Sequence, residues 1–113
     1  MRQNSLFEAE AGTGGQDAAR LVLYALGDFQ VRGKVLAGRD LPFDRLRGAF
    51  RRAAAALGAR ELDDETVAAT LDALGANVRR VPSFVAKHPF RVVVPEALAE
   101  RSRGFFLETK KRD

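Results

Sequence analysis

Apolar residues recur at intervals of three or four along two central segments of the chain, which is the spacing of one buried helix face. In the first segment they are Leu46, Phe50, Ala53 and Leu57. In the second they are Val67, Leu71, Leu74 and Val78. Pro is tolerated in the first turn of a helix and Gly commonly ends one. The sequence therefore predicts one helix that begins at Asp40-Leu41-Pro42 and stops before Gly58, and a second helix from Asp63 to Gly75.

The second of these helices has the clearest start in the chain. Asp63 is a typical N-cap, and Asp64 and Glu65 follow in the first turn, where negative charge complements the helix dipole. Leu62 and Val67 have the spacing of a hydrophobic staple across that turn. Capping accounts for this acidic cluster without a bound cation.

Short apolar runs follow the second helix at once. The runs Val78–Val85 and Phe90–Val94 are joined by the tight link Ala86-Lys87-His88-Pro89, which predicts a β-hairpin. Pro82 cannot donate a hydrogen bond to a neighbouring strand, so it favours an edge position. Beyond Pro95 the sequence predicts a last short helix through Ala97, Leu98 and Arg101, with Phe105, Phe106 and Leu107 as a final packing anchor.

The N-terminal third of the chain is open to two interpretations. Asp17 is a plausible N-cap for a helix that includes Leu21–Leu26 and ends at Gly27-Asp28, followed by a short strand over Phe29–Val35. Alternatively, Leu21–Leu26 is a strand and Gly27-Asp28 is a hairpin turn. Either way, the Gly-rich residues 1–16 are expected to be a flexible lead-in.

Composition predicts a single domain. The chain has 113 residues, 46% of them hydrophobic, and no Cys, so disulfides and thiolate chemistry are excluded. The expected division is a lead-in (1–16), a globular domain (17–107) and a basic C-terminal tail (108–113). No apolar run approaches the length of a membrane span or a secretory signal, so we expect a cytoplasmic protein.

The predicted order is helix, short strand, helix, helix, β-hairpin. Over residues 17–95 this order resembles the winged helix-turn-helix family. The segment from Asp64-Glu65-Thr66-Val67 to Gly75, followed by Val78-Arg79-Arg80-Val81, resembles the third helix of that fold leading into its wing. The expected fold class is α+β and winged-helix-like, with a short C-terminal helix. The alternative is an unclassified α+β domain made of a β-hairpin, two helices and a second hairpin.

The resemblance implies nucleic-acid binding, most readily of DNA. The net charge is +4, and it is distributed as basic (17–60), acidic (61–76) and basic (77–113) segments. Contacts to phosphates would come from the hairpin and the tail, through Arg79, Arg80, Lys87, Arg91, Lys110, Lys111 and Arg112. The alternative role of the hairpin charges is to protect an exposed strand edge from aggregation.

The third helix departs from the family pattern, because its exposed positions carry no base-reading side chains. They are Glu65, Ala68, Ala69, Asp72 and Ala73. Carboxylates are repelled by phosphates, so the second hypothesis is a protein-interaction or dimerisation module that uses the acidic helix 63–75 or the hairpin edge. Candidate partner contacts are Arg45, Arg47, Arg51 and Arg52. The chain shows no catalytic, metal or cofactor motif and no evident small-molecule site, and His88 stands alone in a turn.

Overall fold

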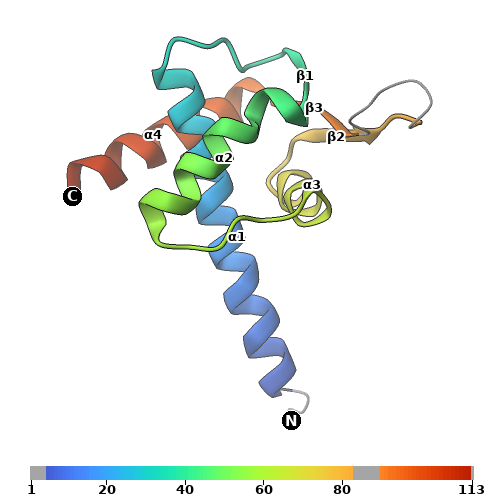
Figure 1. Ribbon diagram of the computed structural model, residues 1–113, viewed down its shortest axis with the longest axis vertical. Helices are drawn as coiled ribbons and strands as arrows, with labels where there is room; N and C mark the ends of the chain where they lie inside the picture. The colour runs from blue at the N-terminus through green and yellow to red at the C-terminus, as the bar shows by residue number, and fades with distance from the viewer. Residues whose placement is uncertain (1–4, 83–89, 113) are drawn as a thin grey trace.

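The computed structural model describes residues 5–82 and 90–112 and combines helices with a small sheet (Figure 1). The elements are α1 (Ser5–Val31), β1 (Asp40–Pro42), α2 (Phe43–Leu57), α3 (Asp64–Ala73), β2 (Asn77–Arg80), β3 (Phe90–Val93) and α4 (Glu96–Arg112). Within these residues the strands form one antiparallel sheet in the order β1-β3-β2. The predicted α+β class is confirmed.

Helix α1 passes through the middle of the molecule, and α2, α3 and α4 pack against it (Figure 1). Every residue from Leu21 to Phe29 is buried. A helix enclosed by other helices is apolar on all sides, which is why Leu21–Leu26 also suits a strand. The helical interpretation of this segment is confirmed.

The predicted end of this helix at Gly27-Asp28 is wrong, and so is the strand predicted over Phe29–Val35. Helix α1 continues to Val31, and Gly33 then turns the chain with a φ of +91°. Gly27 serves a different purpose, because a Cβ atom there would lie 2.3 Å from Cβ of Phe106. Gly27 is therefore the point at which α4 crosses closely over α1.

Helix α1 also begins earlier than expected. It starts at Ser5, so Asp17 lies inside the helix, and the backbone of residues 5–16 is helical where a flexible lead-in was expected. Extending an existing helix costs less free energy than nucleating a new one, which gives a physical reason for this extension.

The first strand of the sheet is the segment Asp40–Pro42, which was expected to open a helix. It pairs with β3, so that buried Leu41 lies opposite Val92. Helix α2 follows directly, with Pro42 at its N-cap position. At its other end, Gly58 adopts the left-handed conformation (φ 63°) and its N–H donates to carbonyl groups of the last turn, as predicted.

Helix α3 has the predicted start and end. The Asp63 side chain accepts a 2.8 Å hydrogen bond from the Thr66 N–H, and Gly75 turns the chain with a φ of +104°. Val67 and Leu71 are buried against the core, and Leu62 and Leu74 are partly buried beside them. The capping interpretation of the acidic cluster is confirmed for Asp63.

Replacing Asp63 with alanine is expected to lower Tm by a few degrees at neutral pH, because the Thr66 N–H loses its acceptor. The hydrogen bond from Thr66 holds the pKa of Asp63 below its ordinary value. A lowered pKa in the folded state stabilises the fold above the unfolded-state pKa, and this contribution is lost as the pH falls through the folded-state pKa. Calorimetry should therefore show the Tm difference narrowing in acid. Asp63→Asn keeps a neutral capping side chain and should retain most of the Tm. A Tm difference between wild type and Asp63→Ala that does not change with pH would contradict the proposed cap.

The two strands of the predicted hairpin are present and pair with each other. Strands β2 and β3 are antiparallel, with Arg80 opposite Phe90, and β2 is an edge strand. Strand β2 ends at Arg80, so Pro82 follows it rather than interrupting it. The predicted link Ala86–Pro89, with Lys87 and His88, lies outside the described residues.

Helix α4 is longer than the short helix predicted after Pro95. It runs from Glu96 to Arg112, so the backbone of residues 108–112 continues the helix instead of forming a frayed tail. Phe106 is buried, and its ring meets that of Tyr24 edge-on at 4.8 Å. Leu107, by contrast, is 46% exposed and does not contribute to the predicted anchor.

Candidate functional site

Two of the hairpin arginines converge on one carboxylate. Arg79 and Arg91 are opposite each other on β2 and β3, and both guanidinium groups bind Asp40 of β1. The Nε–Oδ1 distance from Arg91 is 3.1 Å, and Arg91 also donates to the Asp40 carbonyl. Desolvation acts to raise the pKa of Asp40, but the hydrogen bonds and charges of the two arginines outweigh it and lower that pKa. The sheet thus contains its own ion-paired cluster.

The remaining described hairpin arginine binds the acidic helix. Arg80 pairs with Glu65 of α3, at 2.5 Å between Nη2 and Oε2. Its guanidinium also lies over the Phe90 ring, 4.3 Å from the ring centre, and Phe90 in turn stacks on Phe43. This arrangement holds Arg80 between α3 and the edge of the core. Lys87, the other predicted contact of the hairpin, lies outside the described residues.

The arginines of α2 are also mostly paired. Arg47 lies between Asp44 (3.7 Å) and Asp64 (3.6 Å), and Arg51 lies 3.9 Å from Glu61. Arg52 binds Asp28 at 2.6 Å. The side chain of Asp28 is only 9% exposed, so this last pair stabilises the fold and is not offered to a partner. Among the described residues, Arg45 is exposed without an ion-pair partner.

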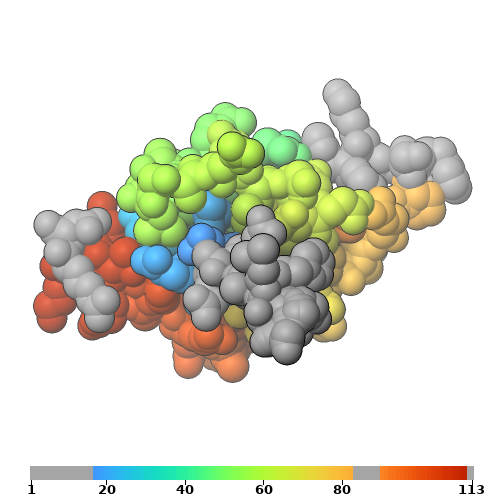
Figure 2. Space-filling model, turned by 90° about the horizontal axis from the view of Figure 1, so that it is seen from below, coloured from blue at the N-terminus to red at the C-terminus, as the bar shows by residue number. Residues whose placement is uncertain are grey.

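The predicted tail residues do not join the hairpin. Lys110 and Lys111 are exposed in the last turns of α4, and Arg112 is its last residue. Figures 1 and 2 place this end of α4 and the hairpin strand β2 at opposite ends of the molecule. The predicted nucleic-acid-binding residues therefore occupy at least two separate surfaces.

The exposed side of α3 is acidic, as the sequence indicates. Glu65, Ala69, Asp72 and Ala73 are exposed. Ala68 was expected to be exposed as well, but it is buried at 9% exposure, because it faces the core with Val67 and Leu71. No basic side chain lies on α3 itself.

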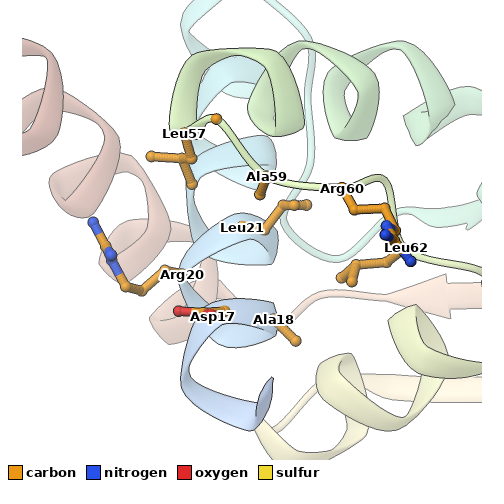
Figure 3. A pocket seen from close by; sticks show the side chains of 9 residues that line it. Asp17, Ala18, Arg20, Leu21, Leu57, Ala59, Arg60 and Leu62 are labelled. Carbon is orange, nitrogen blue, oxygen red and sulfur yellow. The ribbon is translucent and has the colours of Figure 1, made fainter. Parts of the chain in front are cut away.

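A hollow of about 390 Å³ lies between residues 17–21, in the middle of α1, and the segment after α2 (Figure 3). Its apolar wall includes Leu21, Leu57 and Leu62. Arg20 and Arg60 extend away from each other on opposite sides of it (Figure 3). Because these charged groups do not converge, the hollow lacks the focused polar contacts of a small-molecule site.

A larger groove of about 770 Å³ follows the line where α1 and α4 meet. Its residues are Ala19, Arg20 and Leu23 of α1, and Glu100, Arg101, Gly104, Phe105, Glu108 and Thr109 of α4. The groove therefore combines an apolar floor with an equal number of basic and acidic side chains. No local pattern in the sequence marks this surface, because the groove forms only where α4 packs against α1.

The described residues contain no group of three or more His, Asp or Glu side chains positioned to hold a metal ion. Among the described helices, none is both long enough and apolar enough to cross a membrane. Comparisons with protein-family models, with curated proteins and with solved structures find no match to this chain.

Proposed function

We propose that this chain is a non-catalytic protein-interaction domain of the winged-helix type. The order α1, β1, α2, α3, β2, β3, with the hairpin directly after α3, supports the winged-helix resemblance. A fold supports many functions, so the function has to be argued from the surface that α3 and the hairpin present.

The observation that favours a protein ligand is the pairing of the hairpin arginines with carboxylates of the same chain. Arg79 and Arg91 bind Asp40, and Arg80 binds Glu65. A phosphate has to compete with these carboxylates for every guanidinium group. The neighbouring exposed side of α3 adds Asp72 and no compensating base. A surface of mixed charge suits complementary protein side chains better than a polyanion.

Duplex nucleic acid is the second candidate, and it rests on the exposure of the same ion pairs. The side chains of Arg79 and Arg80 are 55% and 57% exposed. Exposed ion pairs are weak, at about 0–1 kcal/mol each, so phosphates can displace the carboxylates at low salt. Such binding would read little sequence and would weaken steeply with salt.

Titration of a fluorescent DNA duplex at two salt concentrations separates the two candidates. We expect no measurable binding by the wild-type chain near roughly 0.15 M salt. The variant Asp40→Asn with Glu65→Gln releases the hairpin arginines, so it should bind the duplex several-fold more tightly at low salt. For this variant, the slope of the logarithm of the binding constant against the logarithm of the salt concentration should become more negative by about one for each additional phosphate that the released arginines neutralise.

The matched control for this variant is Asp17→Asn with Glu96→Gln, which changes the net charge equally at positions outside the hairpin cluster. It should leave duplex affinity close to that of the wild type. Tight, salt-dependent binding by the wild type at physiological salt, lost in Arg79→Ala with Arg80→Ala, would overturn the proposed function in favour of nucleic-acid binding.

A further inference from the structure

The groove between α1 and α4 has the features of a contact surface. Leu23, Phe105, Ala19 and Gly104 provide apolar area, and Arg20, Arg101, Glu100 and Glu108 provide charge. Among the side chains of residues 17–82 and 90–111, none lies within 4.0 Å of these charged groups as an ion-pair partner. The charges of the groove are thus available, in contrast to those of the hairpin.

Gly104 is not required by the packing of the chain itself. It lies exposed in the interior of α4, and a Cβ atom built on it has no heavy atom of another group within 4 Å. Glycine in the interior of a helix costs stability relative to alanine. At Gly27 that cost is offset because the missing side chain lets α4 pack closely against α1. Gly104 has no such close neighbour in this chain. Close approach of a helix from another molecule would account for it.

The positions on α4 also match those of a second α4 running in the opposite direction. With a two-fold axis midway between Gly104 and Phe105, Arg101 of each copy lies opposite Glu108 of the other. The same axis sets Phe105 of each copy over Gly104 of the other, and Glu100 opposite Thr109. Every groove residue of α4 is thereby paired with another groove residue. A surface that is complementary to itself is what an isologous dimer requires.

We propose that a second copy of this chain occupies the groove, forming a two-fold dimer in which two α4 helices pack antiparallel across Gly104. This proposal goes beyond the proposed function, because the groove is a second interaction surface, separate from the hairpin and α3. The opposite charges at Arg101 and Glu108 favour a second copy over a partner of one charge sign, because these two residues are complementary to each other across the two-fold axis. The hairpin and α3 lie outside this interface and stay accessible.

Sedimentation equilibrium over roughly a hundredfold range of concentration tests the dimer. We expect the mass to rise from that of the 12.4 kDa monomer to twice that value. Arg101→Glu alone, or Glu108→Arg alone, sets like charges opposite each other twice per dimer and should weaken association by about tenfold. The double variant Arg101→Glu with Glu108→Arg restores opposite charges and should recover most of the wild-type affinity.

Arg103→Glu is the matched control, because Arg103 is exposed on α4 but does not line the groove. It should dimerise like the wild type. Gly104→Leu should fold, since space is open at that position, and should prevent close approach of the second helix. Circular dichroism of each variant verifies the fold.

A chain that stays monomeric at every concentration overturns the dimer, while the outcome of the duplex titration still decides the proposed function. If the chain dimerises but neither single charge reversal nor Gly104→Leu changes the dimer affinity, the groove is not the dimer interface. Failure of the double variant to recover affinity overturns the proposed pairing of Arg101 with Glu108.

Discussion

Gly27→Ala is expected to reduce the free energy of unfolding by about 3 kcal/mol, at the upper end of the usual cost of overpacking a core. The added methyl carbon would lie 2.3 Å from Cβ of Phe106 and 2.5 Å from the carbonyl oxygen of Ser102. The first of these neighbours is the rigid base of a side chain and the second is backbone, so neither can move aside without shifting α4. The small gain in helix propensity from alanine does not offset that shift.

Urea denaturation followed by circular dichroism measures this loss. Gly48→Ala is the control, because Gly48 lies in α2 and the nearest group to its Cβ position is the end of the Arg52 side chain at 3.4 Å, an ordinary van der Waals contact. That substitution should stabilise the chain by about 0.5–1 kcal/mol. If Gly27→Ala proved as stable as Gly48→Ala, the claim that α4 packs too closely on α1 for a side chain at Gly27 would be contradicted.

Gly27 also shows where sequence reasoning failed. A Gly-Asp pair after an apolar run is a typical helix end, and only the position of Phe106, far along the chain, reveals a crossing point instead. Helix α3 was predictable because its signals are local: Asp63 caps it and Gly75 follows its end. The three-residue strand β1 was missed, because a segment that short is defined by its partner β3 and not by its own pattern.

The candidate site was predictable only in its residue types. Arg79, Arg80 and Arg91 do lie on the predicted hairpin. Their electrostatic state depends on Asp40 and Glu65, which are 39 and 15 residues away from Arg79 and Arg80 along the sequence. The charge blocks of the sequence separate basic from acidic segments, whereas the fold brings them together. A block of like charge therefore did not indicate a free surface.

The pair between Asp28 and Arg52 is the second feature that only the fold reveals. Asp28 lies in the buried part of α1, and Arg52 of α2 binds the same carboxylate oxygen through Nε at 2.7 Å and Nη2 at 2.6 Å. Arg32, which directly follows the end of α1, adds a contact at 3.2 Å. A charge held in the interior depends on such partners, because its lost hydration has to be replaced.

We expect Arg52→Met to reduce the free energy of unfolding by about 2–3 kcal/mol, somewhat below the usual cost of breaking a buried pair, because Arg32 remains beside Asp28. Arg51→Met is the control at the neighbouring position, where the ion pair is 3.9 Å long and both side chains are well exposed. It should change stability by no more than about 0.5 kcal/mol.

Adding Asp28→Asn to Arg52→Met should recover part of the lost stability, because the amide has nearly the same shape and removes the buried charge. The double-mutant cycle, measured by urea denaturation, should therefore give a coupling energy of about 1–2 kcal/mol. Asp28→Asn alone should cost less than Arg52→Met alone, since the two half-exposed arginines it releases can turn to water. If Arg52→Met cost no more than Arg51→Met, or if the two substitutions of the cycle were simply additive, the buried carboxylate would not depend on Arg52 as this geometry requires.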